Sequence, residues 1–390
     1  MKLIYIITRL DWGGSSENLI ELAEGFYNEG NDIILIYGGS ALRNFKFKSY
    51  HIPTLRREIN LIYDLKTFWK IFNIIKKEKP DIIHTHTSKA GIIGRWTAFF
   101  YNLTHFRRIK IIHTPHGHIF YGYFNRLKSY LFLFIEKISS LITDKLIALT
   151  ENEKKESINF GVAKEDKWLV IPSGISYDIK IANRNLKKEL LISEDKIVAG
   201  TAGRLEKVKG MEYFVRSLKY LMNILMLNDI NKDIVYLIVG DGSELNYLKE
   251  ISLKDNVSSK IIFTGYRKDV VDLINIMDIY VQSSLNEGMG RAVVIAELLS
   301  KPVIASNVCG LKDLVQDGYN GFLVESQNSL QIAIKIYDLI KDEELRIKMG
   351  KNSFDFINRE EDGFKKYSFE RCFYLHKKLY FSISNKSDSL

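Results

Sequence analysis

The sequence predicts an α/β protein of two doubly wound domains, each a parallel sheet with helices on both faces. Short apolar runs rich in β-branched residues recur along the chain, and helical stretches separate them. Strands that are apolar throughout are buried on both faces, which is typical of parallel sheets. A chain of 390 residues also exceeds what one hydrophobic core supports, so two domains are expected.

The expected strands form two series of six. They are residues 3–8, 32–37, 82–86, 110–114, 145–150 and 168–172, then 197–201, 234–239, 260–264, 279–283, 303–306 and 321–324. Pro172 and Gly174 end the first series, so the expected domains are residues 1–175 and 176–353. The aromatic-rich remainder, 354–390, is expected to be a helix that packs across the domains, with a frayed end from residue 382.

Composition excludes several classes of protein. Hydrophobic residues make up 46% and charged residues 26%, as in ordinary globular chains. The two cysteines, Cys309 and Cys372, favour a reducing cytoplasm over a disulfide framework. Polar residues interrupt the first apolar run too early for a secretion signal, and no run reaches the roughly 18 apolar residues of a membrane span.

Positive charge is concentrated in the first half. Residues 1–175 carry 25 Lys and Arg against 17 Asp and Glu, whereas the remainder carries 31 against 30. A basic surface favours an anionic partner, but no nucleic-acid-binding motif is present, so nucleic acid is not expected. Residues 121–138 mix aromatic, leucine and basic residues. This pattern fits a helix on a membrane surface and equally a buried helix whose basic ends reach water.

The segment 286–291, Asn-Glu-Gly-Met-Gly-Arg, lies between an expected strand and an expected helix. This arrangement points backbone amides and a positive dipole at an anion. The carboxylate of Glu287 would repel a phosphate but would accept hydrogen bonds from sugar hydroxyls. The combination predicts a site for a sugar attached to a phosphate.

Two cations follow the first strand of the second half. Arg204 and Lys209 are placed on one loop, which suits a diphosphate, although solvated surface cations would give the same pattern. Tyr266 follows another strand, and its flat ring could contact a nucleobase.

Polar residues also follow the strands of the first half. Gly13 and Gly14 allow close approach of the backbone to a ligand, or make a tight turn. Lys89 in the first turn of a helix opposes the helix dipole, which indicates a nearby anion. Six of the eight histidines lie between residues 84 and 118. Their spacing matches no zinc pattern, and we expect alternating histidines to point to opposite faces, so a polar cleft wall is favoured over a metal site.

Taken in order, these segments resemble glycosyltransferase family 4, the retaining nucleotide-sugar transferases of the GT-B fold, in which two Rossmann-like domains face each other across a cleft. The resemblance rests on residues 12–14, 86–91, 113–117, 203–210, 239–242, 263–266 and 287–291. The segments at Lys89 and His116 look most like members that build bacterial capsule or lipopolysaccharide on a lipid carrier.

The resemblance implies roles for individual residues. Arg204 and Lys209 would hold the donor diphosphate and stabilise the leaving nucleotide. Glu287 would bind the transferred sugar, and His116 would lie beside it. Donor contacts would also come from Gly13, Gly14, Tyr266, Gly288, Met289, Gly290 and Arg291, and acceptor contacts from His86, Ser88 and Lys89. The donor would be a UDP-sugar, the acceptor a glycan or lipid-linked saccharide at the inner membrane face, and no metal or other cofactor is expected.

One position departs from the family. A second glutamate normally follows the first by eight positions and binds the ribose, but Ile295 stands there. Glu297 lies two residues further, about 200° around a helix, and should face elsewhere. The departure leaves open a non-catalytic scaffold or partner subunit of the same fold, whereas a nucleotide-sugar epimerase fits the Lys89 and Glu287 segments poorly.

Overall fold

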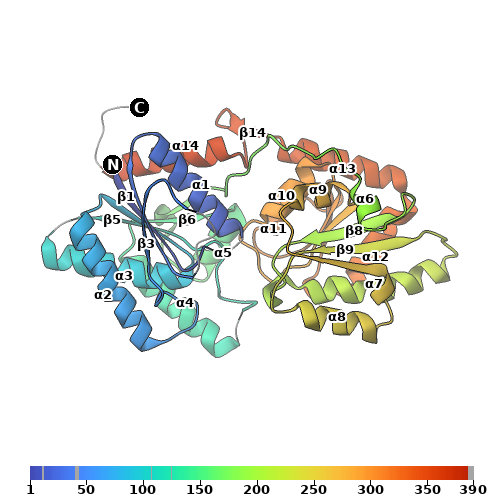
Figure 1. Cartoon of the computed structure of the whole chain (residues 1–390), viewed down its shortest axis with the longest axis horizontal. Coiled ribbons are helices and arrows are strands. Elements are labelled where there is room, and N and C mark those ends of the chain that lie inside the picture. The colour runs from blue at the N-terminus through green and yellow to red at the C-terminus, as the bar shows by residue number, and fades with distance from the viewer. Residues whose placement is uncertain (11–12, 40–43, 107, 124, 385–390) are drawn as a thin grey trace. The chain divides into compact units, whose positions relative to one another are not determined.

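The computed structural model describes residues 1–10, 13–39, 44–106, 108–123 and 125–384. The chain divides into two units (Figure 1). The first unit comprises residues 1–174 and 368–390, and the second comprises residues 175–367. Each unit contains its own parallel sheet covered by helices, so the predicted fold class is confirmed.

The sheet of the first unit has the strand order β3-β2-β1-β4-β5-β6-β7, and all its pairs are parallel. Its strands are β1 (Lys2–Ile7), β2 (Asp32–Tyr37), β3 (Lys48–His51), β4 (Ile82–His86), β5 (Lys110–Thr114), β6 (Lys145–Ala148) and β7 (Trp168–Val170). Helices α1 and α14 lie on one face and α2, α3 and α4 on the other (Figure 1). These helices, with α5, are α1 (Gly14–Asn28), α2 (Leu61–Glu78), α3 (Ser88–His105), α4 (Arg126–Leu141), α5 (Glu151–Asn159) and α14 (Phe369–Ser384).

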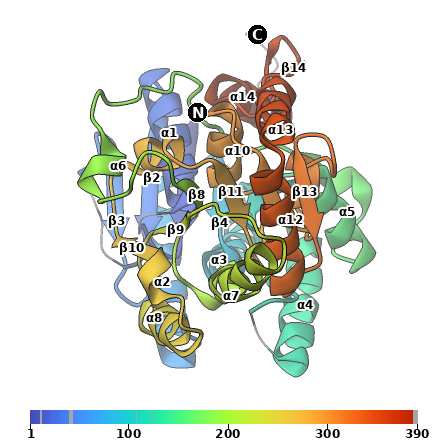
Figure 2. The ribbon, with the colours of Figure 1, turned by 90° about the vertical axis from the view of Figure 1, so that its right-hand side faces the viewer.

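The sheet of the second unit has the order β10-β9-β8-β11-β12-β13, again all parallel. Its strands are β8 (Ile197–Ala202), β9 (Ile234–Val239), β10 (Ile261–Gly265), β11 (Ile279–Gln282), β12 (Val303–Ser306) and β13 (Gly321–Val324). The helices are α6 (Leu186–Glu189), α7 (Met211–Leu227), α8 (Leu245–Lys254), α9 (Val270–Asn275), α10 (Arg291–Leu298), α11 (Leu311–Leu314), α12 (Ser329–Lys341) and α13 (Glu343–Ile357). Helices α7 and α12 lie side by side (Figure 2).

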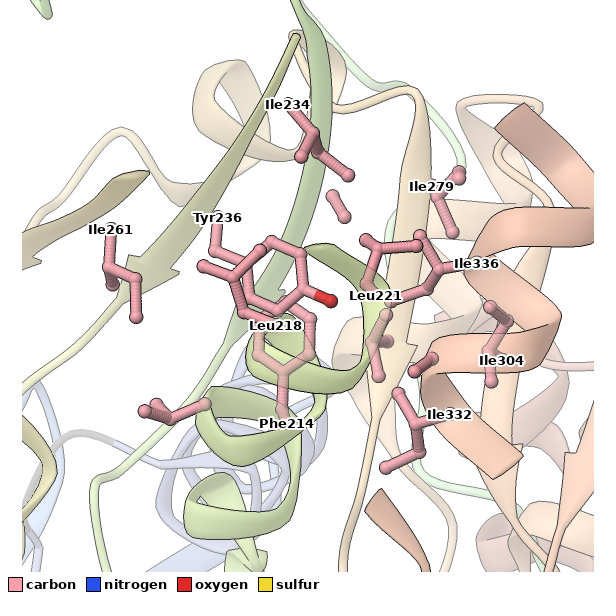
Figure 3. Close-up of a cluster of buried hydrophobic side chains, with 14 of the residues drawn as sticks. Phe214, Leu218, Leu221, Ile234, Tyr236, Ile261, Ile279, Ile304, Ile332 and Ile336 are labelled. Atoms are coloured by element: carbon pink, nitrogen blue, oxygen red, sulfur yellow. The ribbon is translucent and has the colours of Figure 1, made fainter. Parts of the chain in front are cut away.

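A hydrophobic core of the second unit lies between the sheet and helices α7 and α12 (Figure 3). Phe214 and Leu218 of α7 are fully buried against strand residues such as Tyr236. The rings of Phe214 and Tyr236 stack with centroids 4.2 Å apart, and the Tyr236 hydroxyl lies 3.0 Å from the Ser217 hydroxyl. The apolar runs that predicted β8, β9 and β11 therefore supply the buried residues that pack against α7 and α12.

Two parts of the chain differ from the sequence prediction. Strand β3 was not expected, because its residues Lys-Ser-Tyr-His include no aliphatic run; it is a mostly exposed edge strand beside β2. The segment 354–390 is not one helix: α13 ends at Ile357, the short strands β14 (Glu360–Glu361) and β15 (Phe364–Lys365) follow, and α14 begins at Phe369. Helix α14 contributes Cys372, Leu379 and Tyr380 to the core of the first unit and continues to Ser384.

Substituting Phe214 tests the packing of this core of the second unit. Phe214→Ala removes a fully buried ring and should lower the free energy of unfolding by about 3–5 kcal/mol. Tyr220→Ala on the same helix is the control, because Tyr220 is 44% exposed, and it should change stability by about 0.5 kcal/mol or less. Urea denaturation followed by circular dichroism measures both. Equal losses would contradict this description of the core.

Candidate functional site

Both sheets reverse their strand order next to their first strand. The reversal falls between β1 and β4 in the first unit and between β8 and β11 in the second. In doubly wound sheets, ligands bind beyond the carboxyl ends of the strands at this switch point. The predicted site residues of the second unit follow β8, β10 and β11, and those of the first unit follow or end β1, β4 and β5.

The structure joins two of the predicted site residues of the second unit directly. The Nζ of Lys209, from the loop after β8, lies 2.5 Å from Oε2 of Glu287, from the loop after β11. Both side chains are largely buried, at 20% and 14% exposed. The ion pair therefore connects the two sides of the switch point and places a cation beside the Glu287 carboxylate.

A chain of hydrogen bonds between polar side chains ends at the Glu287 carboxylate. The hydroxyl of Ser284 donates to Glu287 Oε2 at 3.2 Å, and the amide of Gln282 donates to Ser284 at 2.8 Å. Gln282 in turn accepts from the Tyr280 hydroxyl at 3.1 Å. All three supporting side chains are buried. None of the three was among the predicted site residues, although the small polar residues that end this strand were the available signal.

Glycines let the loops of this edge approach one another closely. Gly210 has a left-handed backbone with φ of 58°, and a Cβ on it would lie 2.1 Å from the Ser283 carbonyl oxygen. A Cβ on Gly240 would lie 1.9 Å from the Gly203 carbonyl oxygen. Because only glycine avoids these clashes, the glycine pattern of the sequence fixes how the ends of β8, β9 and β11 fit together.

The remaining predicted donor residues of the second unit follow strands at the same edge of its sheet. Arg204, 37% exposed, follows β8 and pairs with Glu206 at 2.9 Å. Tyr266 follows β10 and is 44% exposed. Residues 288–291 turn the chain into α10, with Met289 buried and Gly290 in a left-handed conformation with φ of 95°. This geometry places the first-turn amides of α10 next to Glu287.

Ile295, which stands where the family has its second glutamate, and Glu297 lie on different faces of α10. Ile295 is partly exposed, whereas Glu297 is fully buried, as expected from the helical rotation. Glu297 Oε1 accepts from the Asn320 amide at 2.7 Å, and its Oε2 has no hydrogen-bond partner among the described residues. Glu297 therefore lies inside the second unit and does not replace the missing carboxylate.

In the first unit, His86 and His116 form a direct pair. His86 Nδ1 lies 2.8 Å from His116 Nε2, and the rings stack with centroids 5.1 Å apart. His86 is fully buried, so its side chain lies behind the partly exposed His116. The expectation that alternating histidines face opposite sides is wrong for His84 and His86. Residues two apart share a face of a strand, and these two rings are 4.1 Å apart.

The anion predicted beside Lys89 is a carboxylate of the chain itself. Lys89 forms an ion pair with Asp64 of α2 and donates to the Glu58 carbonyl oxygen at 3.2 Å. Ser88, at the start of α3, lines a small cavity together with Pro115 and His118. The volume of this cavity is about 20 Å³, which is room for one water. Lys89 and Ser88 thus lie together at the start of α3, with the Lys89 charge already partnered.

Gly13 and Gly14 precede and begin α1, where Gly13 accepts backbone hydrogen bonds from Ser16 and Glu17 at 3.1 Å. Trp12, which belongs to the same sequence segment, lies outside the described residues.

Thr87, which follows β4, has an unusual backbone. Its φ of 67° and ψ of 154° fall in a region that is almost restricted to glycine and costs about 1–3 kcal/mol. The Thr87 hydroxyl lies 2.8 Å from that of Thr8 on the loop after β1, and its amide donates to the Thr114 carbonyl at 3.1 Å. These contacts hold strain at the switch point of the first unit, directly after His86.

Helices α2 and α4 expose apolar side chains among basic ones. In α4 the buried residues are serines, whereas Leu127, Tyr130, Leu131 and Phe134 are 53–80% exposed, so the interpretation of 121–138 as a buried helix is wrong. We call the exposed residues of both helices the basic–apolar surface: Leu61, Ile62, Leu65, Lys66, Trp69, Lys70, Asn73, Lys76, Lys77, Arg126, Leu127, Lys128, Tyr130, Leu131, Phe134 and Leu141.

The structure describes every residue of α2 and α4, and none of their exposed residues is acidic. Helix α3 contacts both helices, and the three lie on one face of the sheet (Figure 1). Among the helices of the described segments, none is both long and apolar enough to cross a membrane.

Comparison with known proteins assigns the family. Residues 12–178 match Glycosyltransferase Family 4, and residues 182–356 match Glycosyl transferases group 1. The chain is 31% identical over 310 residues to the UDP-Gal:alpha-D-GlcNAc-diphosphoundecaprenol alpha-1,3-galactosyltransferase of Escherichia coli, with 78% of each chain covered. The chain belongs to glycosyltransferase family 4.

A second relative agrees with this assignment, and a solved structure agrees with the fold. The glycosyltransferase is 30% identical over 323 residues to the capsular polysaccharide biosynthesis glycosyltransferase CapM of Staphylococcus aureus, covering 80% of this chain and 81% of CapM. Its fold is similar to that of Anabaena HepE in complex with UDP and glucose, with a TM-score of 0.80, 19% identity, and coverage of 98% and 100%. The resemblance inferred from the sequence and the GT-B fold are confirmed.

The buried Glu297 predicts a pH-dependent stability for this glycosyltransferase. Burial raises the pKa of its carboxyl well above the ordinary value of 4.5, so the folded state keeps this proton longer than the unfolded state. As pH rises above the ordinary value, the unfolded chain releases the proton first and the free energy of unfolding falls.

Glu297→Gln cannot ionise, so it should be more stable than the wild type at about pH 8 and should lose this advantage at about pH 4. Urea denaturation at both pH values measures the difference. A difference that does not change with pH would show that the Glu297 carboxyl titrates normally.

Proposed function

We propose that this glycosyltransferase transfers a sugar, with retention of the anomeric configuration, from a UDP-sugar to a lipid-linked or polysaccharide acceptor in bacterial surface glycan synthesis. The observation that carries the proposal is the Lys209–Glu287 pair at the switch point of the second unit. The named relatives support the chemical class, since one is named for a diphosphoundecaprenol-linked acceptor and another for capsular polysaccharide biosynthesis.

The proposed roles follow from charge and position. Lys209 and Arg204 would neutralise the donor diphosphate, which removes the need for a metal ion. Glu287 would accept hydrogen bonds from the transferred sugar while Lys209 offsets its negative charge, so a carboxylate and a diphosphate can share one site. The amides of residues 288–291 and the ring of Tyr266 complete the proposed donor contacts, together with Gly13, Gly14 and His116.

We propose front-face chemistry for the transfer. The bond between the anomeric carbon and the diphosphate oxygen breaks, and the acceptor hydroxyl bonds to that carbon from the same side. The released phosphate oxygen takes the hydroxyl proton, so no separate protein base is required. The positive charges of Arg204 and Lys209 would stabilise the negative charge that develops on the leaving diphosphate.

For the acceptor, we propose contact with the inner face of the membrane. The basic–apolar surface belongs to the unit that carries the proposed acceptor residues Ser88 and Lys89. Exposed leucine and aromatic side chains can enter the headgroup region, and lysines attract anionic lipids, each contributing about 1 kcal/mol. A lipid-linked acceptor would then be bound where its carrier already lies.

Substitution of Glu287 and Arg204 tests the donor site. Glu287→Ala should abolish sugar transfer, and Arg204→Ala should lower turnover by about 100-fold or more while the fold persists. Glu250→Ala is the matched control, because this carboxylate of α8 is exposed and should leave transfer unchanged. Transfer is measured with radiolabelled UDP-sugars and lipid-linked acceptors.

Wild-type turnover in Arg204→Ala would show that Arg204 does not bind the donor diphosphate. A wild-type chain without transferase activity toward any such donor would favour the non-catalytic scaffold that Ile295 suggests.

Vesicle binding tests the membrane contact. The wild type should sediment with vesicles that contain about one third phosphatidylglycerol and much less with pure phosphatidylcholine, because lysine attraction requires anionic lipid. Lys66→Glu combined with Lys70→Glu should weaken binding at least tenfold. The control is Lys249→Glu with Lys254→Glu on α8 of the second unit. Equal binding of the wild type to both kinds of vesicle, or equal loss in the control, would contradict the proposal.

A further inference from the structure

The His86–His116 contact constrains where protons lie. A neutral imidazole carries one N–H and one bare nitrogen, so a contact between two neutral rings needs one donor and one acceptor. Burial lowers the pKa of His86 well below its ordinary value, with smaller contributions from the neighbouring His84, His116, His376 and His113. His86 is therefore neutral at neutral pH, and its single proton sits on Nδ1 or on Nε2.

The surroundings of His86 decide between these nitrogens. Nδ1 faces His116 Nε2 at 2.8 Å, whereas Nε2 is buried with no hydrogen-bond partner among the described residues. A buried N–H without an acceptor is rarer in proteins than an acceptor without a donor. The favoured arrangement keeps the proton on His86 Nδ1, from which it is donated to His116 Nε2. Neutral His116 then carries its own proton on Nδ1.

We propose that His86 is a positioning residue that holds His116 as the Nδ1–H tautomer, so that His116 presents a hydrogen-bond donor to a hydroxyl of the transferred sugar. The part of this proposal that concerns the sugar rests on the proposed function. The tautomer itself rests on the contact between the two rings and on the burial of His86 Nε2. His86 does not touch the sugar, because its side chain is fully buried.

Both rings are held by their backbones. His86 ends β4 and is followed by the strained Thr87, whose amide is bonded to Thr114 of β5. His116 has a left-handed backbone with φ of 57°, and the next amide, that of Gly117, donates to the buried Glu153 at 2.7 Å. The chain thus fixes the two ring positions from β4, β5 and α5, which is how a positioning pair is expected to be built.

Nitrogen NMR of the full chain labelled with ¹⁵N-histidine tests the tautomer directly. Protonated and bare ring nitrogens have well-separated shifts, and spectra of His86→Asn and His116→Asn assign the signals. We expect His116 with a proton on Nδ1 and a bare Nε2, and His86 with a proton on Nδ1. A proton on His116 Nε2 would overturn the proposal. The result does not depend on transferase activity, so the proposed function can fail separately.

Activity of His86 variants tests the positioning role. In His86→Asn the side-chain amide replaces Nδ1 as a donor to His116, so kcat/KM should stay within about threefold of the wild type. His86→Leu loses the hydrogen bond and should lower kcat about tenfold with acceptor KM unchanged, as expected for one lost hydrogen bond.

The matched control is His84→Leu. His84 is buried on the same strand and bonds to Tyr380 and Thr114, not to His116. A purely structural role of the buried histidines predicts equal losses in both leucine variants and no rescue by asparagine, and either result would overturn the positioning role.

Discussion

The ion pair between Lys209 and Glu287 is the interaction on which the rest of the second unit depends. It joins the loops after β8 and β11 across the switch point, and the glycines of these loops allow the close approach that it needs. It also resolves a conflict in the sequence, where a carboxylate lies next to a turn suited to a phosphate. With Lys209 beside it, Glu287 would add little repulsion toward a bound diphosphate and would keep oxygen atoms for the sugar hydroxyls of the proposed donor.

The first unit has two distinct features, one at the carboxyl edge of its sheet and one on the helices that cover a face of the sheet. At the edge, the ends of β1, β4 and β5 are tied by Thr8, Thr87 and Thr114, and the His86–His116 pair is built on that frame. On the face, α2 and α4 present basic and apolar side chains to solvent. The cost of the strained Thr87 backbone is offset by the surrounding contacts, as is common at functional sites.

Much of this was predictable from the sequence, and the failures have physical causes. Apolar runs located the buried strands, because burial on both faces demands them, but β3 is an edge strand with no such run. Helical rotation placed Glu297 away from the site. The partner of Lys89 is Asp64, 25 residues earlier in the chain, and no local pattern indicates that pairing. The exposure of the apolar side chains in residues 121–138 could not be predicted either, because membrane-surface helices and buried helices have similar compositions.

The most direct test of the central claim is nucleotide binding by the wild type and by Lys209→Met, measured as stabilisation against unfolding. A ligand that binds only the folded state adds about 2.7 kcal/mol at 100 times its dissociation constant. We expect UDP to stabilise the wild type selectively among nucleoside diphosphates, and we expect Lys209→Met to lose most of this effect. No stabilisation by any nucleotide, or equal stabilisation of both proteins, would contradict a diphosphate site at the Lys209–Glu287 pair.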